Sequence, residues 1–432
     1  MTHPCRALFP ALIQPPTSGV AFFDNAGGSQ LPQCVIDAAT RYLTFSYANT
    51  GGAYAPSRDA AATIKLAHEI VKLFLNAAPA LHAPREQTTG EVILGASSTA
   101  LCHLVASAYA DARDAGWPHA KARASRNEII VAAAGHEANI GPWARLAARG
   151  YTIRFWPTEK TAQGFRPSLD TLRTLLNERT QLVAFPHVSN ILGEVWDPRP
   201  AIELAKAAGA RTMVDGVAYA PHAAPDVRAL ACDWYVYSAY KVFGPHMGAL
   251  FGTHEALGEL EGPNHFFIPR DEIPRKWEVG GASHEGCAMI AALWTFACQV
   301  TGEDPASTPR RDIIASAMTQ MARAERGLLK PLIEGLAAHP RLRVIGSTAS
   351  DETRVATIGF VHESRPARDI ATLANEQNLG LRWGHFYSKR LLDELAPQYR
   401  LNPDDGVVRV SLLGYNTRDE IDRLLEFLAS AC

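Results

Sequence analysis

The sequence predicts an α/β fold, in which helices flank a mostly parallel central sheet, joined to a smaller α+β domain at the C-terminal end. Between about residues 90 and 250, short and nearly all-apolar runs alternate with alanine-rich helical patterns, which is typical of βαβ units. After about residue 300, one long amphipathic pattern is followed by fewer, more widely spaced apolar runs. The 432 residues are enough to bury a substantial core and to form more than one domain.

The elements of the larger domain follow from these patterns in chain order. Short apolar runs predict strands at 91–94, 128–132, 152–156, 181–185, 211–215, 233–238 and 247–252. The segments between them predict helices at 101–110, 143–148, 169–176 and 200–208. Strands that are apolar throughout are expected where helices cover both faces of a sheet.

The C-terminal part of the chain predicts a second set of elements. They are a helix at 310–338, strands at 341–346 and 356–361, a helix at 367–377, a strand at 407–412 and a helix at 417–429. Ser, Pro and Gly residues at 15–19 separate the N-terminus from the following segment, and we expect the N-terminus to pack against the C-terminal domain. The sequence therefore predicts a large domain of residues 21–300 and a small domain formed by 1–20 and 301–432.

Charge and cysteine content exclude several classes of function. The 42 Lys and Arg residues against 44 Asp and Glu give a formal net charge of −2, so no basic surface for nucleic acid or for a membrane is expected. Seven cysteines without a CxxC pair predict reduced thiols, with neither a disulfide framework nor a metal site. The N-terminus is a poor signal peptide and no apolar run is long enough to cross a bilayer, so we expect a cytoplasmic protein.

Polar residues recur where the predicted strands end, which is where an open α/β sheet binds its ligands. Gly95-Ala96-Ser97-Ser98-Thr99 follows a strand and opens a helix. Its hydroxyl and N–H groups form a cradle for an anion such as phosphate, or serve only as a helix cap. The sequence has no GxGxxG or GxxxxGK[ST] motif, which disfavours a dinucleotide or a nucleoside triphosphate.

His136, Asn190 and Asp215 each follow or end a predicted strand. Any one of them is also compatible with a loop residue whose polar atoms are satisfied locally. Of the three, Asp215 points most strongly to a ligand site, because burying a carboxylate at the end of an apolar strand is costly unless the carboxylate contacts a cation. The protonated nitrogen of a pyridine ring would supply that cation.

Lys241 ends the next predicted strand, in Ser238-Ala239-Tyr240-Lys241. This position predicts a desolvated amine, with a pKa lowered towards the range in which the amine is nucleophilic. Because surface lysines greatly outnumber catalytic ones, the prediction depends on the combination of Lys241 with Asp215, Asn190 and His136.

In this combination the chain resembles the cysteine desulfurases and related members of the class-V aminotransferase family, which are fold-type I enzymes that use pyridoxal 5′-phosphate (PLP). The resemblance extends over essentially the whole chain. The motifs that carry it, in the family's order, are Phe22-Phe23-Asp24-Asn25-Ala26, His136-Glu137-Ala138-Asn139, Val188-Ser189-Asn190, Val214-Asp215-Gly216, Ser238-Ala239-Tyr240-Lys241, Gly384-His385 and Arg409-Val410-Ser411-Leu412.

The resemblance implies a role for each of these residues. Lys241 would form the Schiff base with PLP and move protons at the α-carbon of the substrate. Asp215 would pair with the pyridine nitrogen, His136 would stack on the ring and Asn190 would reach the ring hydroxyl. The other implied contacts are Ser98, Thr99, Ser238 and Tyr240 with the cofactor, and Arg382, Arg409, His385 and Asn25 with the substrate. Because the family is usually homodimeric with shared active sites, the 278–283 loop would serve the neighbouring subunit.

The chain departs from the family's pattern where a desulfurase carries sulfur. Tyr387 stands at the position of the cysteine that forms the persulfide, and a phenol cannot accept a sulfur atom and pass it on. Tyr240 replaces the usual histidine before the lysine, and Ala218 replaces a glutamine near the cofactor. Tyr387 is then either a general acid or a pocket-lining aromatic, and Cys287 is either a displaced sulfur acceptor or a buried, inert thiol.

The sequence therefore predicts a PLP enzyme that acts on a small amino acid through an α-carbanion. The leading hypothesis is a C–S or other β-elimination lyase without persulfide relay. Three alternatives stay open: an aminotransferase or epimerase of the same family, a true cysteine desulfurase that uses a displaced cysteine, and a non-catalytic partner subunit. Transamination and epimerisation begin from the same carbanion, so Lys241 does not distinguish them.

Overall fold

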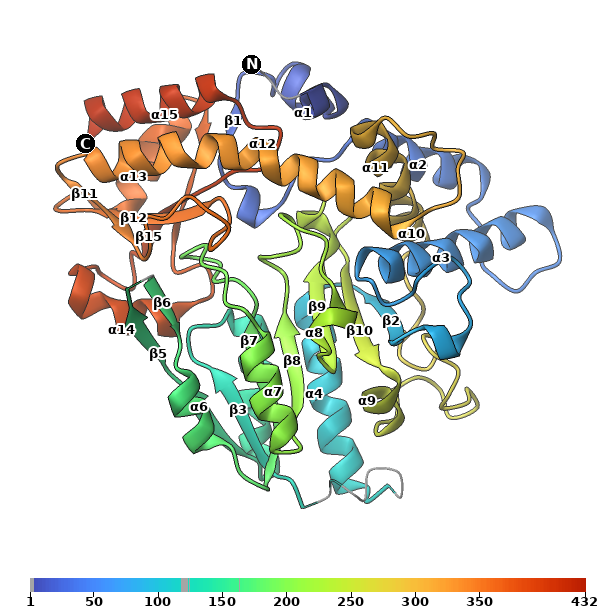
Figure 1. The fold of residues 1–432 in the computed structure, drawn as a ribbon. Helices are drawn as coiled ribbons and strands as arrows, with labels where there is room; N and C mark the ends of the chain where they lie inside the picture. The colour runs from blue at the N-terminus through green and yellow to red at the C-terminus, as the bar shows by residue number, and fades with distance from the viewer. Residues whose placement is uncertain (1–3, 118–122, 124, 163) are drawn as a thin grey trace.

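Figure 1 shows the computed structural model of the chain, which describes residues 4–117, 123, 125–162 and 164–432. A seven-stranded sheet lies at the centre of the larger part of these residues. In spatial order its strands are β2 (Gly90–Gly95), β10 (Gly248–Thr253), β9 (Trp234–Ser238), β8 (Arg211–Asp215), β7 (Thr180–Pro186), β3 (Glu128–Ala132) and β4 (Thr152–Trp156).

All neighbouring strands from β9 to β4 are parallel, whereas β10 runs antiparallel to both β9 and β2. The prediction of an α/β fold with a mostly parallel sheet is therefore confirmed. Because parallel strands share one direction, the residues that follow β3, β7, β8 and β9 all leave the sheet at the same edge. This edge carries the polar residues that the sequence singled out.

Helices cover both faces of this sheet, because successive side chains of a strand point to opposite sides. On one face, Ile129 and Val131 of β3 pack in a cluster with α4 (Ser98–Asp114) and α5 (Gly141–Ala144). On the other face, Ile130 of β3 packs with α3 (Ala55–Phe74) and α7 (Arg199–Ala207). Burial on both sides explains why the middle residues of β3 and β7 are apolar, while the polar residues of β7 and β8 lie at the strand ends.

The C-terminal part forms a second, antiparallel sheet of four strands. In spatial order they are β11 (Leu342–Ile345), β12 (Thr357–His362), β15 (Val407–Ser411) and β14 (Arg382–Gly384). One face of the sheet packs against α12 (Arg311–Ala338), α13 (Ala367–Glu376) and α15 (Arg418–Ala431). The long helix α12 runs from the end of α11 (Leu293–Thr301) across to this second sheet (Figure 1).

The N-terminal segment contacts both parts of the molecule. The Phe9 ring lies 5.8 Å from the ring of Phe243, 5.7 Å from Phe296 and 4.8 Å from Tyr415, measured between centroids. The short strand β1 (Ala21–Phe22) pairs in parallel with β13 (Leu379–Gly380), close to the C-terminal sheet. The division into domains of residues 21–300 and of 1–20 with 301–432 stays a prediction.

Several elements differ from their sequence-based expectation. The helix expected at 143–148 is a short α5 followed by the 3₁₀ helix η6 (Arg145–Arg149), which ends at Gly150 with a φ of 80°. The sequence patterns also gave no assignment for a group of elements that the structure contains, namely α2 (Gln33–Phe45), α3, the hairpin β5 (Thr158–Thr161) and β6 (Gly164–Pro167), α10 (His284–Ala291), α11, β14 and α14 (Lys389–Tyr399).

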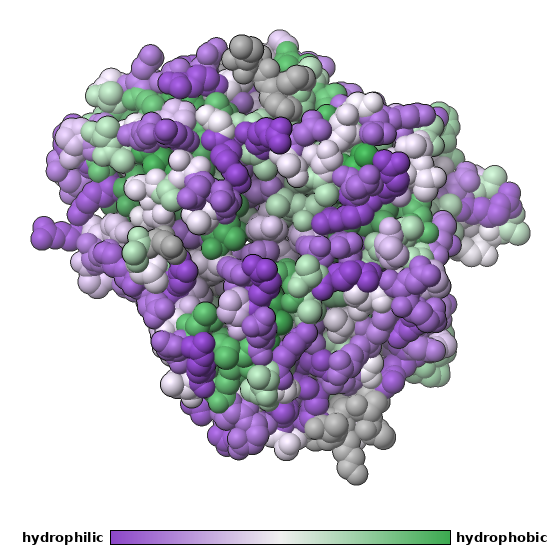
Figure 2. All heavy atoms as spheres, viewed as in Figure 1, coloured by the Kyte–Doolittle hydropathy of each residue, from purple (hydrophilic) through white to green (hydrophobic). Residues whose placement is uncertain are grey.

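The face of the molecule in Figure 2 is predominantly hydrophilic, with hydrophobic residues in small groups. Exposed large apolar side chains come mainly from two stretches of sequence. These are Leu43, Phe45, Tyr47 and Tyr54, from the end of α2 to the residue before α3, and Phe266, Phe267 and Val279 before α10. Within the described residues, no helix combines the length and the apolar character that crossing a bilayer requires.

Candidate active site

Lys241 lies at the carboxyl edge of the seven-stranded sheet, in the short 3₁₀ helix η7 (Ala239–Lys241) that follows β9. The residue is buried, with 8% of its surface exposed. Burial disfavours the ammonium form and, with the nearby charge of Arg409, lowers the pKa of Lys241 to about 8, although Asp215 acts in the opposite direction. In the described part of the chain, its amine has neither a hydrogen bond nor an ion pair, and it lies 5.9 Å from the centre of the Tyr240 ring.

Asp215 ends the neighbouring strand β8 and is also buried. Its Oδ1 accepts a hydrogen bond from the backbone N–H of Val217 at 2.9 Å. Burial raises the pKa of the Asp215 carboxyl, while this N–H group and the charge of Lys241 act to lower it. Among the described residues no cation contacts the carboxyl, so a cationic partner from a ligand would stabilise its charged form.

His136 follows β3 and presents a neutral ring to the same site. Its Nδ1 accepts a hydrogen bond from the backbone N–H of Ala138 at 3.0 Å, which leaves the ring proton on Nε2. Burial, together with the charges of Lys241 and Arg409, lowers the pKa of His136 to about 3. The ring therefore stays uncharged at neutral pH and is suited to stacking on a flat ligand.

A cradle for an anion lies where α4 begins. Ser97 caps the helix by accepting a hydrogen bond from the N–H of Ala100 at 3.1 Å. The next hydroxyl, Ser98 Oγ, lies 2.9 Å from Ser238 Oγ at the end of β9. A Cβ atom at Gly248 would lie 2.4 Å from the backbone N of Ser98, so only glycine lets β10 approach this closely. The free N–H groups and hydroxyls at this helix start suit a phosphate.

Two arginines extend the site from the C-terminal sheet. Arg382 on β14 and Arg409 on β15 lie directly opposite each other. Asp24 bridges them, because its Oδ1 lies 3.0 Å from Arg409 Nη2 and its Oδ2 lies 3.1 Å from Arg382 Nε. The Phe386 ring packs below both guanidinium groups, at 3.8 Å from that of Arg409 and 5.4 Å from that of Arg382. Asp24 and Phe386 thus fix the spacing of the pair.

Arg409 keeps one donor for a ligand. It is buried, and burial lowers its pKa to about 10. Its Nη1 donates to the backbone oxygen of Asn190 at 3.1 Å, and its Nη2 is held by Asp24. Its Nε is buried without a hydrogen-bond partner in the described structure. A carboxylate bound here would satisfy that donor, as guanidinium–carboxylate geometry allows.

Two predicted site residues have their polar atoms bound within the protein. Asn25 Nδ2 donates to the backbone oxygens of Phe22 and Ser411, both at 2.8 Å, and Asn25 Oδ1 accepts from Tyr415. Asn190 Nδ2 donates to the backbone oxygen of Phe386 at 2.9 Å. Asn190 Oδ1 accepts from the Ser388 hydroxyl at 2.7 Å. These bonds make Asn25 a link between the N- and C-terminal segments and let Asn190 hold the 386–388 loop. The Asn190 amide keeps a second N–H group, so a contact between Asn190 and a ligand stays a prediction.

Tyr387 lies on that loop, above His136. Their ring centroids are 5.3 Å apart, and the backbone N–H of Glu137 donates to the backbone carbonyl oxygen of Tyr387 at 2.8 Å. Phe386 and Tyr387 have φ values of 47° and 59°, which are uncommon for residues other than glycine and mark a locally strained turn. His385 Nδ1 accepts from the Tyr387 N–H at 3.1 Å. The phenol side chain is 65% exposed and faces an open cleft.

This cleft has a volume of about 790 Å³ and is the entrance to the site. Thr99, His136, Tyr240 and Tyr387 line it together with residues that sequence reasoning did not single out, including His103 and Arg145. The Tyr240 ring stacks on His246, with centroids 4.6 Å apart and planes at 11°. The sequence signal for His103 was its position one helical turn after Thr99.

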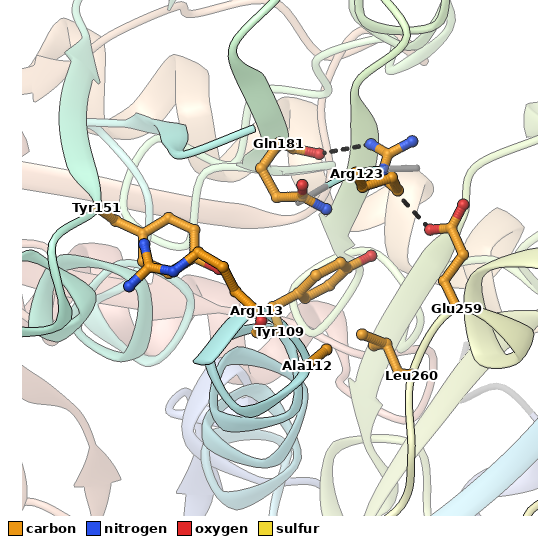
Figure 3. A pocket seen from close by; sticks show the side chains of 8 residues that line it. All are labelled: Tyr109, Ala112, Arg113, Arg123, Tyr151, Gln181, Glu259 and Leu260. Atoms are coloured by element: carbon orange, nitrogen blue, oxygen red, sulfur yellow. Dashed lines mark hydrogen bonds and ion pairs between the residues drawn. The ribbon is translucent and has the colours of Figure 1, made fainter. Parts of the chain in front are cut away.

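A second cavity lies at the amino edge of the same sheet, between the start of β7 and α4 (Figure 3). Its volume of about 20 Å³ is sufficient for one water molecule. Figure 3 shows Arg123 directed towards the backbone oxygen of Gln181 and the carboxylate of Glu259. This cavity is too small for a substrate and contains side chains that bind one another. The described residues contain no group of three or more His, Cys, Asp or Glu side chains arranged to hold a metal ion.

The residues at the carboxyl edge fit PLP. The Asp215 carboxyl lacks a cationic contact, which a protonated pyridine nitrogen would provide. Lys241 supplies a buried amine with a lowered pKa, and the neutral His136 ring supplies a flat surface. Ser98 and Ser238 place two hydroxyls at the start of α4, where a phosphate group is stabilised.

The chain is similar to known proteins along almost its whole length. The family model described as aminotransferase class-V matches residues 21–266 and 312–424. The aminotransferase-like protein FGM3 of Gibberella zeae is 34% identical, over 97% of this chain and 96% of that protein. A cysteine desulfurase of Escherichia coli is 30% identical, over 97% of this chain and 95% of that protein. The apo structure of a cysteine desulfurase from Thermococcus onnurineus matches the fold with a TM-score of 0.81 at 22% identity, covering 100% of this chain and 98% of that one.

Proposed function

The chain belongs to the class-V aminotransferase family and is a PLP-dependent, cysteine desulfurase-like enzyme; from that premise we propose that it is a lyase that expels a substituent from the β-carbon of a small amino acid, without passing sulfur to a protein cysteine. The observation that carries this proposal is the position of Tyr387, a phenol on the strained loop directly above His136. We propose that Tyr387 stands where the desulfurases of this family have their sulfur-accepting cysteine.

PLP, when bound, withdraws electrons from the α-carbon of an amino acid and so favours loss of the α-proton. We propose that Lys241 carries the cofactor, that Asp215 meets its pyridine nitrogen and that His136 lies against its ring. The proposed phosphate contacts are Ser98, Thr99 and Ser238, with Tyr240 beside the ring.

Lys241 is the proposed base for the α-proton. With a pKa of about 8, roughly one tenth of the amine would be uncharged at pH 7, far more than for an ordinary lysine. A neutral amine accepts a proton and can return it later, which is the behaviour expected of a general base with a pKa near the working pH.

Arg409 and Arg382 are the proposed ligands of the substrate carboxylate. The unpartnered Nε of Arg409 and the half-exposed guanidinium of Arg382 support this assignment. Asp24 acts through them as a positioning residue, because it holds one nitrogen of each. His385, beside Tyr387 on the same loop, is proposed to lie near the substrate as well.

Departure of the β-substituent requires a proton donor on the cleft side of the substrate, and Tyr387 is proposed for this role. Tyr240 is a weaker candidate, because burial raises the pKa of its phenol. Cys287 gives little support to a displaced sulfur relay: it is fully buried on α10, and burial raises the pKa of its thiol to about 12. At neutral pH such a thiol contains almost no thiolate, the form that accepts sulfur.

Transamination is the second candidate, supported by the similarity of this chain to the aminotransferase-like protein of Gibberella zeae. It uses the same proton removal by Lys241 but returns the proton elsewhere and requires a second, keto-acid substrate. We also propose that the enzyme is a homodimer in the cytoplasm. Phe266 is 95% exposed and lies before the 278–283 loop, so a second copy of the chain would bury it.

The test uses the purified enzyme loaded with PLP and supplied with L-cysteine. The proposal predicts pyruvate, ammonia and sulfide in equal amounts, with no persulfide on the protein. Lys241→Ala should lose both this turnover and the visible absorbance band of lysine-bound PLP. Lys330→Ala, an exposed lysine on α12, is the matched control and should change neither.

Two further variants separate the alternatives. Tyr387→Cys should acquire a protein persulfide and produce alanine, because it restores a thiol above His136. Alanine and a protein persulfide formed by the unmodified enzyme, and lost in Cys287→Ser, would establish the desulfurase alternative instead. Turnover that depends on an added keto acid would establish transamination.

A further inference from the structure

The entrance cleft has a cationic end that the proposed chemistry does not use. We propose that Arg145 and His103 form a subsite for a carboxylate at the far end of the β-substituent, so that the preferred substrates are amino acids whose leaving group is itself acidic. This inference rests on the proposed function, because it places the substrate's β-carbon beside Lys241.

The cleft extends along one side of α4, away from the proposed cofactor position. Thr99 and His103 both line it and lie one helical turn apart, which corresponds to about 6 Å along the helix axis. Arg145 lines the same cleft from the start of η6. The cationic end is therefore displaced from the proposed phosphate cradle by about the length of a short side chain.

Arg145 differs from the other arginines near this cleft in having no partner. Arg149, four residues later in η6, is held by Asp111 at 2.8 Å and by Asp114 at 2.6 Å. Arg390 lies 3.6 Å from Glu137, which also lines the cleft, and so balances its charge. Among the described residues, Arg145 makes neither a hydrogen bond nor an ion pair. Its planar fork of donors is free to bind a carboxylate.

His103 supports the same subsite as a neutral donor. Burial and the adjacent charge of Arg145 lower the pKa of His103, so its ring is uncharged at neutral pH. A neutral imidazole still offers one N–H group to a ligand. The combination places one positive charge and one neutral donor at the far end of the cleft, which suits a single carboxylate.

The wall between the two ends is apolar except at Glu137, whose carboxylate lies 3.6 Å from Arg390. Ala138, Pro142 and Ala144 line the cleft between His136 and Arg145 in the sequence. A thioether or a methylene chain would contact these residues without leaving a polar atom unsatisfied. A β-substituent of the type S–CH₂–COO⁻ has both the apolar link and the terminal acid that this arrangement would recognise.

The test compares two substrates that differ only at the far end. S-carboxymethyl-L-cysteine carries the acid, and S-carbamoylmethyl-L-cysteine is its neutral amide analogue. The PLP-loaded enzyme is titrated with each compound, and the shift of the visible cofactor band gives the dissociation constant. Cleavage of the same compounds is followed separately as pyruvate release.

We expect the unmodified enzyme to bind the acid more tightly than the amide. Arg145→Gln should lower the ratio of the two affinities about tenfold while leaving the affinity for the amide unchanged. Arg145→Lys should retain part of the preference, because it keeps the charge without the fork. Arg343→Gln, an exposed and unpaired arginine on β11 within the described structure, is the control and should alter neither constant.

Equal affinity for acid and amide in the unmodified enzyme, or an equal change for both in Arg145→Gln, would overturn the subsite. Failure of the proposed lyase gives a different result. In that case both compounds shift the cofactor band but neither releases pyruvate, and the ratio of the two dissociation constants still decides the subsite.

Discussion

The two edges of the seven-stranded sheet differ in whether their buried charged residues have partners of opposite charge. At the amino edge, Asp233 is buried and accepts from Arg211 Nη1 at 2.7 Å and from the N–H of Thr212 at 2.8 Å. Arg211 in turn contacts Glu255 at 2.6 Å. At the carboxyl edge, Asp215 and Lys241 are buried to a similar degree, yet neither contacts an opposite charge in the described structure.

On the proposed function, this difference separates charges that serve the fold from charges that serve the chemistry. A buried ion pair with complete hydrogen bonding stabilises a structure only while both partners remain. A buried amine or carboxyl without a partner destabilises the protein, and it persists where a ligand or a reaction uses it. The paired network of Arg211 and the unpaired Lys241 lie on the same sheet, so the comparison is internal to one protein.

The largest expected effect tests the carboxyl edge. Asp215→Asn should lower turnover of the PLP-loaded enzyme by about 10³-fold, because a neutral amide no longer stabilises a protonated pyridine nitrogen. It should not destabilise the cofactor-free protein in urea denaturation. Asp233→Asn at the amino edge is the matched control and should give the reverse: near-normal turnover with lower stability. Equal losses of turnover in the two variants would remove the distinction between the edges.

The amino edge is tested by breaking its network. Arg211→Met should lower the free energy of unfolding by about 4 kcal/mol, because it leaves the buried carboxylate of Asp233 without its partner. The turnover of the protein that remains folded should be unchanged. The measurement is denaturant unfolding together with activity per folded molecule. A variant as stable as the unmodified protein would contradict the structural role of the network.

Removing the unpaired amine of Lys241 should change the free energy of unfolding in the opposite direction. Lys241→Met keeps a similar volume and should raise the free energy of unfolding of the cofactor-free protein at pH 7 by about 3 kcal/mol. The lysine pKa falls from 10.5 in the unfolded chain to about 8 in the folded one, so the folded state binds its proton less well.

The pH dependence provides the control for this prediction. The penalty from Lys241 is complete below pH 8 and disappears as the pH rises to 10.5, because the unfolded chain then also loses its proton. The gain from Lys241→Met should therefore shrink over that interval. A gain that is independent of pH would mean that packing, not charge, is responsible.

The smallest effect concerns the arginine pair. Asp24→Asn should raise the KM for the amino acid by about tenfold and change kcat less, because Arg382 and Arg409 lose the carboxylate that fixes their spacing. The visible band of bound PLP should be unaffected. Asp422→Asn, which breaks an exposed pair with Arg418 on α15, should leave KM unchanged.

Sequence patterns predicted the sheet well because its signal is local. The strands at 128–132, 152–156 and 211–215 have the predicted bounds, since each is a short stretch that contains β-branched, aromatic or other apolar residues and lies between helical patterns. Lys241 was found in the same way, at the end of such a run. The strand β14 was missed because three residues, two of them exposed, carry no alternation of apolar and polar positions.

The site was less predictable where contacts join distant parts of the chain. Asp24 lies in a recognisable motif, but its partners Arg382 and Arg409 are near the other end of the sequence, and no local pattern connects them. Asn190 was predicted to contact a ligand from its place after a strand and from the family resemblance, and Asn25 from the motif in which it stands. Their polar atoms are bound within the protein, which only the three-dimensional arrangement of the C-terminal segments reveals.

The bridge between Asp24 and Arg409 joins residues 385 positions apart, which affects how the protein matures during synthesis. Domains fold as their segments leave the ribosome, starting from the N-terminus. The seven strands that surround Lys241 are complete once residue 253 has emerged, whereas both arginines are still to be made. A nascent chain therefore contains every residue proposed to contact the cofactor long before it contains the two arginines proposed to bind the substrate, which are added only when translation is nearly finished.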